Sequence, residues 1–254
     1  MEVHVLASGS DGNCTVIESD GDAIMIDAGI SCRRIMSLMD QQGLDKEMIK
    51  AILITHEHSD HVSGAGATAR KLDVPIVANE LTFNESNLGD VQHWVYKSNS
   101  TIDIGQFHVT PLPTSHNAVD PNCYFTEVDD KKVLVATDTG KFSFQIEHAL
   151  ALADVAVVEA NYDREMLVNG PYPPSLKKLI NSDHGHMNNV DTAAAIRRTM
   201  GENEHRQIFL AHLSRTNNTP DTARQSVADI TGIKRMRIDC LEFPGDTRTI
   251  NVRG

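Results

Sequence analysis

The sequence lacks the features of membrane, secreted and disulfide-rich proteins. No stretch of the 254 residues approaches the apolar length that spans a bilayer. The N-terminus, MEVHVLASGS, has neither a basic region nor a long apolar segment, so we expect no signal peptide. The four cysteines lie far apart and form no CxxC pair, which argues against a disulfide framework or a zinc ribbon. We therefore expect a cytoplasmic protein.

An excess of positive charge is also missing, because the formal net charge is -12. This charge argues against a protein that coats nucleic acid non-specifically, since such binding depends on basic side chains that neutralise phosphates. It does not exclude a nuclease, because bound divalent cations would add local positive charge that the formal count omits.

The chain has no internal repeat, low-complexity tract or flexible linker, so we predict one domain over residues 1–254. Short strand-like runs dominate the first half, and helices alternate with apolar strands in the last third. The predicted strands are Val3–Ala7, Cys14–Glu18, Ala23–Ile26, Ala51–Ile54, Pro75–Ala78, Trp94–Tyr96, Phe107–Leu112, Cys123–Val128, Lys132–Val135, Val155–Val158, Ile208–Ala211 and Met236–Cys240. The predicted helices are Ser31–Gln42, Val62–Leu72, Phe144–Ala153, Asn189–Met200 and Pro220–Ile230. This pattern predicts an α/β fold with two packed sheets and helices outside them.

The most informative stretch is LITHEHSDH, which directly follows a predicted buried strand. In an extended HxH, alternate side chains point to the same side, so His56 and His58 can chelate one ion together. Asp60 and His61 come where the chain should turn into a helix, and they could serve a second ion. Imidazole and carboxylate suit zinc, manganese or iron(II). The alternative is a charged loop that happens to contain histidine, but so dense a motif after a buried strand has little structural purpose.

Two ions need more ligands than this segment supplies. His116 follows FHVTPLPTS, Asp138 follows VLVAT and His212 follows IFLA, so each comes just past an apolar strand. Ligands at strand ends converge at one edge of a sheet, where α/β proteins place their sites. Any one of the three could be a cap or turn residue, but together they predict a metal site.

The HxHxDH pattern followed by these three residues resembles the metallo-β-lactamase-fold superfamily. IMIDAG resembles its early acidic turn, with Asp27 as a supporting residue. The resemblance covers essentially the whole chain and implies a four-layer αβ/βα sandwich, in which two mixed β-sheets are flanked by helices. It also implies two divalent metal ions (Mn, Zn or Fe) in a groove at the sheet edges. The implied ligands are His56, His58 and His116 for the first ion, Asp60, His61 and His212 for the second, and Asp138 between them.

Two further motifs narrow the resemblance. The Asp60-His61 pair favours dinuclear hydrolases, because zinc β-lactamases usually lack the second histidine. SDHGHMNNVDTAAAIRR followed by IFLAHLSRTNNTP resembles the ribonuclease Z-type phosphodiesterases. There the histidine at the position of His186 stabilises or protonates the scissile phosphate and is not a ligand, whereas His184 is expected to be a surface residue.

LASGSDGNCTVIESDGDAIMIDAG and EANYDREMLVNGPYPPSLKKLINSDHGHMNN closely resemble the YycJ/WalJ family. That resemblance implies a metal-dependent exonuclease that cuts duplex DNA in the 5′ to 3′ direction. One departure is Met187-Asn188, where many relatives are expected to have Leu-Ser. Asn in place of Ser keeps a helix-capping residue.

The resulting hypothesis is a dinuclear phosphodiesterase in which a metal-bridging hydroxide attacks phosphorus. Asp60 would orient or deprotonate the water, and His186 would help the leaving oxygen depart. The alternative is a small-molecule hydrolase that acts on a cyclic phosphodiester or, like glyoxalase II, on a thioester, and the acidic charge favours it. A non-hydrolytic metal sensor is the third hypothesis.

Substrate contacts are less strongly indicated. The loop Ser8–Asn13 is either a tight turn between strands or a phosphate-binding loop in which Ser8, Ser10 and Asn13 face the groove. Asn161 either orients a ligand or is only a turn residue that opens the next helix, and it is also a candidate for substrate contact. The basic residues considered for DNA contact are Arg215, the best placed, and Arg33, Arg34, Lys177 and Lys178. No membrane partner is expected, and a homodimer would widen the groove of an acidic protein. The histidines expected to be structural are His4, His93, His108, His148 and His205.

Overall fold

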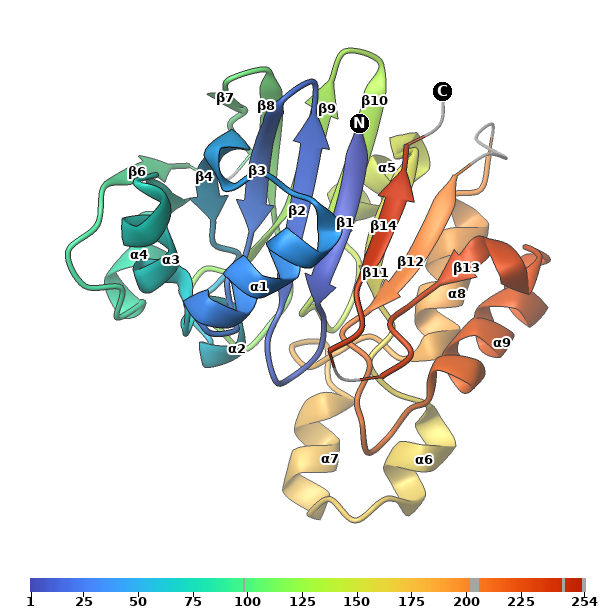
Figure 1. The fold of residues 1–254 in the computed structure, drawn as a ribbon. Coiled ribbons are helices and arrows are strands. Elements are labelled where there is room, and N and C mark those ends of the chain that lie inside the picture. Colours follow the sequence, from blue (N-terminus) through green and yellow to red (C-terminus); the bar gives the residue numbers. More distant parts are fainter. Residues whose placement is uncertain (98, 202–205, 244, 253–254) are drawn as a thin grey trace. The chain divides into compact units, whose positions relative to one another are not determined.

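The computed structural model describes residues 1–97, 99–201, 206–243 and 245–252 (Figure 1). His205 therefore lies outside the described residues. The chain divides into two compact units. Unit 1 comprises Met1–Pro113, Ala118–Lys131 and Phe243–Val252, and unit 2 comprises Thr114–Asn117 and Lys132–Glu242. That they form a single domain stays a prediction.

The first sheet lies within unit 1 and has seven strands in the order β14-β1-β2-β3-β4-β5-β6. β14, β1, β2 and β3 pair antiparallel, and β3 to β6 pair parallel. The strands are β1 (Glu2–Ala7), β2 (Cys14–Ser19), β3 (Asp22–Ile26), β4 (Ile49–Leu53), β5 (Ile76–Asn79), β6 (His93–Tyr96) and β14 (Arg248–Asn251).

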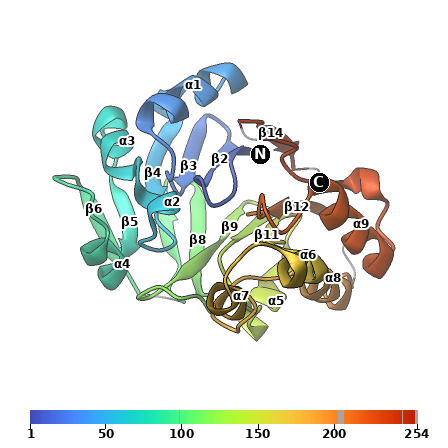
Figure 2. The same ribbon diagram turned by 90° about the horizontal axis from the view of Figure 1, so that it is seen from below.

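Helices α1 (Cys32–Gln42) and α3 (Ala65–Leu72) cover one face of this sheet (Figure 2). α1 begins at the Ser31 cap and ends at Gly43, whose φ of 72° suits glycine. Its buried residues, Ile35, Leu38 and Met39, have helical spacing and pack on alternate residues of the strands, such as Val16 and Met25. The short helices of this unit are η1 (Lys46–Met48), α2 (Ser59–Val62) and α4 (Glu80–Glu85).

The second sheet also has seven strands, in the order β13-β12-β11-β10-β9-β8-β7. Within unit 1, β7 (Ile102–Ile104), β8 (Phe107–Pro113) and β9 (Asn122–Val128) form an antiparallel meander. The parallel strands are β10 (Lys131–Ala136), β11 (Val155–Glu159), β12 (Gln207–Ala211) and β13 (Ile238–Asp239). β10, β11 and β12 are almost continuously apolar, as strands buried on both faces are.

In unit 2, helices alternate with these parallel strands along the sequence. α8 and α9 pack on each other, and α6 and α7 lie side by side in both views (Figures 1 and 2). The helices are α5 (Phe144–Leu152), α6 (Arg164–Asn169), α7 (Pro174–Ile180), α8 (Asn189–Arg198), α9 (Pro220–Thr231) and η2 (Arg235–Arg237).

Two mixed sheets of seven strands with flanking helices confirm the predicted fold class. The single helix predicted over Val62–Leu72 is wrong, because α2 ends at Val62 and α3 starts at Ala65. Gly64 separates them and lies so close to the Ile30 carbonyl that a Cβ would come within 1.9 Å of it. The sequence patterns did not predict the short elements α4, α6, α7, β7, β14, η1 and η2. None of the helices in the described part of the chain is long and apolar enough to cross a membrane.

Candidate metal centre

The loop after β4 gathers the four predicted ligands of unit 1. His56 and His61 are buried, and their ring centroids lie 4.1 Å apart. The Nε2 atom of His56 lies 3.0 Å from Nδ1 of His58. Asp60 brings Oδ2 to 3.4 Å from Nε2 of His61. The HxHxDH spacing thus places three imidazoles and one carboxylate together, with Asp60 and His61 in the first turn of α2.

Backbone hydrogen bonds fix this loop against two other segments. The Asn13 N–H donates to the Asp60 carbonyl over 2.8 Å, and the Ala28 N–H donates to the His61 carbonyl over 2.9 Å. Gly29 permits this approach, because a Cβ there would lie 1.7 Å from the Asp60 carbonyl oxygen. The loop of residues 56–61, called the metal loop below, is therefore fixed by backbone hydrogen bonds from two other segments.

A buried carboxylate sets the tautomers of two histidines. Asp27 Oδ2 lies 2.7 Å from His61 Nδ1, and the same carboxylate accepts from the Thr55 N–H at 2.9 Å. The single Thr55 hydroxyl proton goes to Asp27, since a carboxylate can only accept. Thr55 Oγ1 must then accept from His56 Nδ1, which is 3.0 Å away. Both histidines therefore carry their proton on Nδ1 and have a lone pair on Nε2.

Unit 2 holds a second cluster, built at the ends of its parallel strands. Asp138 follows β10 and His212 follows β12, and both are buried. Asp138 Oδ1 lies 3.6 Å from Nε2 of His212 and 3.8 Å from Nε2 of His116. Asp138 and His212 have left-handed backbone, with φ of 56° and 55°, as does Asp27 in unit 1 with 58°. Non-glycine residues rarely adopt this conformation, and it concentrates at functional sites.

Glu159, the last residue of β11, is the member of this cluster that sequence reasoning missed. Its carboxylate is fully buried, accepts from the Thr139 N–H at 2.9 Å, and lies 2.6 Å from His186 Nδ1 and 3.3 Å from His212 Nδ1. Burial alone would raise the pKa of Glu159, but the positive charge and hydrogen bond of His186 and the bond from His212 lower it below its ordinary value. The available signal was an acid that directly ends the apolar run VAVV.

The pKa values of His186 and His116 are shifted in opposite directions. Burial would lower the pKa of His186, but the Glu159 carboxylate outweighs burial and raises it. For His116, burial outweighs the attraction of Asp138, so its pKa is lowered and the ring is neutral. His116 donates from Nδ1 to the Gly185 carbonyl over 2.9 Å and directs Nε2 toward Asp138.

These donor sets fit a divalent metal. His56, His61, His116 and His212 each have Nδ1 next to a protein acceptor, which leaves Nε2 as the donor atom. Metal-binding histidines typically donate their other nitrogen in this way. Mixed imidazole and carboxylate donors suit zinc, manganese and iron.

The predicted substrate residues are distributed unevenly. Asn13 is buried, and its amide lies 3.0 Å from His61 Nε2 and 3.4 Å from Asp60 Oδ2, so it contacts the metal loop. Asn161 is also buried and donates to the His212 carbonyl at 2.8 Å. Ser8 is half-buried, whereas Ser10 and Arg215 are exposed. Direct contact of these five residues with substrate stays a prediction.

Comparison with known proteins identifies the family. A family model described as the metallo-beta-lactamase superfamily matches residues 7–206. The exodeoxyribonuclease YycJ of Bacillus anthracis is 38% identical over 235 residues, which cover 91% of this chain and 89% of that protein. The exodeoxyribonuclease WalJ of Streptococcus pneumoniae is 39% identical over 232 residues, which cover 89% of this chain and 86% of WalJ.

Among solved structures, the metallo-beta-lactamase fold protein YhfI from Bacillus subtilis matches with a TM-score of 0.75 and 15% identity, and the match covers 98% of each chain. At this identity the match shows the fold alone, and it agrees with the predicted fold class. The family model and the two relatives confirm the predicted family. The chain therefore belongs to the metallo-beta-lactamase superfamily of hydrolases and, within it, to the family of YycJ and WalJ.

Proposed function

We propose that this protein is a metal-dependent phosphodiesterase that acts as an exonuclease on DNA. Two relatives named as exodeoxyribonucleases are 38% and 39% identical, and the chain covers most of their length. The structural observation that carries the proposal is the Glu159–His186 pair beside Asp138 and His212, because it adds a proton donor to a cluster of metal-type ligands.

Four of the proposed ligands belong to unit 1 and three to unit 2. His56, His58 and His116 would hold one divalent ion, Asp60, His61 and His212 would hold a second, and Asp138 would contact both. The tautomers of His56 and His61 and the neutral ring of His116 support this assignment. Divalent ions bound there would polarise the phosphoryl group and lower the pKa of water. Manganese, zinc and iron are the proposed ions.

His186 would act on the leaving oxygen. Its Nδ1 proton is held by Glu159 at 2.6 Å, which fixes the ring and turns Nε2 away from that carboxylate. The Glu159 carboxylate raises the pKa of His186 and so favours its protonated form. About a fifth of the side chain is exposed, so a phosphate can reach it. His186 would thereby stabilise the growing negative charge and donate a proton as the P–O bond breaks. Asp60 would orient the attacking water.

The assay uses end-labelled duplex DNA with manganese. We expect the wild type to shorten the strands stepwise and His186→Ala to keep its metal content while losing activity by about 100-fold or more. His184→Ala is the matched control, because His184 is exposed and lies two residues away. Loss of metal from His186→Ala would show that this histidine is a ligand. Turnover of a lactoyl thioester without any DNA cleavage would favour the small-molecule hydrolase.

We further propose that the chain forms one domain and works in the cytoplasm. All four cysteines are free, which fits a reducing compartment. The proposed homodimer would give an acidic protein a wider binding surface for DNA. Light scattering at micromolar concentration tests it, and a monomer mass would contradict it.

A further inference from the structure

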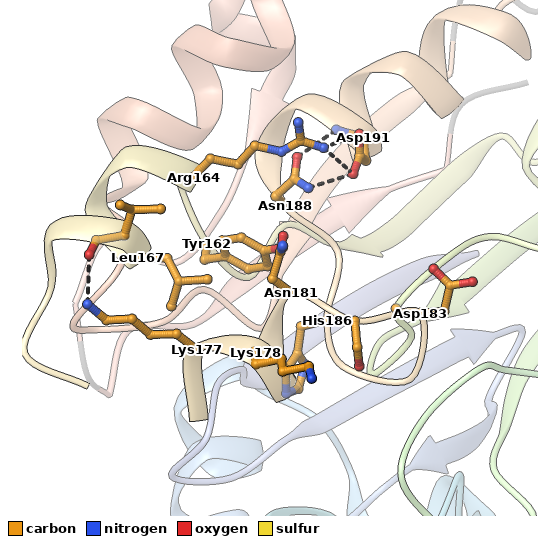
Figure 3. Close-up of a pocket in the computed structure, with 13 residues that line it drawn as sticks. Tyr162, Arg164, Leu167, Lys177, Lys178, Asn181, Asp183, His186, Asn188 and Asp191 are labelled. Atoms are coloured by element: carbon orange, nitrogen blue, oxygen red, sulfur yellow. Dashed lines mark hydrogen bonds and ion pairs between the residues drawn. The ribbon is translucent and has the colours of Figure 1, made fainter. Parts of the chain in front are cut away.

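A pocket of about 530 Å³ opens within unit 2 between α6, α7 and the segment that leads into α8 (Figure 3). Its size lies within the range of small-ligand sites, about 300–1,000 Å³, which suits a single nucleotide unit but not a length of duplex. Residues from both helices line it, including Val168 of α6 and Lys178 of α7. The pocket therefore depends on the two short helices that the sequence patterns did not predict.

His186 belongs both to this pocket and to the candidate metal centre. It lines the pocket, and its ring centroid lies 5.0 Å from that of His116 and 5.2 Å from that of His212. A phosphate in contact with His186 would therefore have the pocket directly beside it. The group attached to that phosphate has room there.

The charges of the lining favour an anion. Its two acids are already paired: Asp191 binds Arg164 at 2.8 Å and 3.0 Å, and Asp183 binds Lys141 at 2.7 Å. Lys178 makes no hydrogen bond or ion pair with any described residue. Lys177 donates only to a neutral carbonyl, that of Val168, at 2.7 Å (Figure 3). Two ammonium groups are therefore not neutralised by carboxylates, in a chain whose net charge is -12.

The pocket walls are held in place by their own core. Tyr162, Leu167 and Ile180 form a buried cluster between the two helices, and Tyr172 packs against it. The Tyr162 hydroxyl donates to Asn181 Oδ1 over 2.7 Å, directly after α7. Val168, which also lines the pocket, is 70% exposed and offers an apolar surface to a base or sugar. The pocket thus combines a cationic and an apolar wall.

We propose that this pocket binds the terminal nucleotide of the DNA strand, with Lys178 on its phosphate side and Val168 against the nucleoside. The inference rests on the proposed exonuclease function and deepens it. A one-nucleotide pocket beside His186 places the scissile bond one nucleotide from the strand end. The protein would accordingly release mononucleotides and bind the released deoxynucleoside monophosphate.

The test is calorimetric titration of the metal-loaded protein with 2′-deoxyadenosine 5′-monophosphate, its 3′-phosphate isomer and inorganic phosphate. We expect Lys178→Glu and Val168→Trp each to weaken nucleotide binding about 10-fold or more, the loss that one charged hydrogen bond or a filled pocket produces. Lys71→Glu, with the same charge change on α3, and Leu179→Trp, on α7 outside the pocket, should stay within about twofold of wild type. Melting temperature and metal content verify that each variant is folded and loaded.

Three results would overturn the assignment: binding unchanged in Lys178→Glu and Val168→Trp, equal losses in the two control variants, or inorganic phosphate binding as tightly as both nucleotides. Binding is read without turnover, so the two proposals fail separately. A wild type that degrades DNA while Lys178→Glu and Val168→Trp bind nucleotide normally refutes the pocket alone. A wild type that binds nucleotide in this pocket but degrades no DNA refutes the exonuclease function.

Discussion

Replacing Asp27 by asparagine should remove the carboxylate that accepts a hydrogen bond from His61, while the metal loop keeps its shape. The side chains are nearly isosteric, and asparagine tolerates the left-handed φ of 58° at this position. The new amide N–H group would, however, face a His61 Nδ1 that now donates to a carboxylate at 2.7 Å. His61 can hydrogen-bond that amide N–H group only by moving its proton to Nε2, and a protonated Nε2 cannot bind a metal. If the proton stays on Nδ1, its remaining acceptor is the Thr55 hydroxyl, which lies 3.2 Å away and already accepts from His56.

The expected magnitude follows from that contact. The hydrogen bond is charged at the acceptor, and its partners are 0% and 3% exposed. Bonds of this kind contribute about 1.5–3 kcal/mol. Loss of such a partner of a ligating histidine typically costs about 10–100-fold in metal affinity. We therefore expect Asp27→Asn to weaken zinc binding by about 10–100-fold, with a smaller effect on folding because the Thr55 N–H can still donate to the amide oxygen.

Chelator competition at pH 7.5 measures this affinity directly. Asp73→Asn is the matched control, because Asp73 has the same left-handed backbone, with φ of 56°, and is exposed at the end of α3. It should bind zinc like the wild type. Equal affinities for Asp27→Asn and the wild type would refute the tautomer argument, and equal losses in both variants would show a general effect of charge.

Three further predictions concern stability and reactivity. Arg206→Ala should lower the free energy of unfolding in urea by about 2–4 kcal/mol. Desolvation lowers the pKa of this buried guanidinium to about 10. The guanidinium donates to the carbonyls of Ala151, Ala153 and Thr199. A loss of stability below about 1 kcal/mol would contradict the prediction. A thiol reagent should label only the half-buried Cys32 in the native protein and all four cysteines in guanidinium, because the other three are buried; rapid native labelling of two would argue otherwise. Burial lowers the pKa of His4 more than nearby carboxylates raise it. The unfolded chain therefore binds a proton on His4 at a higher pH than the folded protein does, and stability falls as the pH drops below about 6.5. Between pH 7.5 and 5, the urea midpoint of His4→Asn should fall less than that of the wild type. Equal falls in both proteins would refute the assignment.

The sequence by itself determined which donor side chains lie together in the loop after β4 and which strands carry the other proposed ligands. HxHxDH places its donors close together whatever surrounds it, because residues two to five apart in a loop cannot separate far. Asp138 and His212 were found because each directly follows an apolar strand, and parallel strands end at one edge of a sheet. Local spacing and strand pattern therefore sufficed for these residues.

Only the tertiary structure decided which groups support the proposed ligands and lie next to them. Glu159 is one of 35 acidic residues, and nothing local distinguishes it until the fold brings its carboxylate to His186, 27 positions away. The Asn13 side-chain amide contacts Asp60 and His61. This contact depends on Gly29, because a Cβ there would clash with the Asp60 carbonyl and keep the segments apart. The pocket of α6 and α7 depends on a small cluster of buried side chains rather than on helical periodicity. A hydrogen-bond partner or a cavity wall is set by the packing of segments far apart in the chain, whereas spacing along the chain constrains only near neighbours.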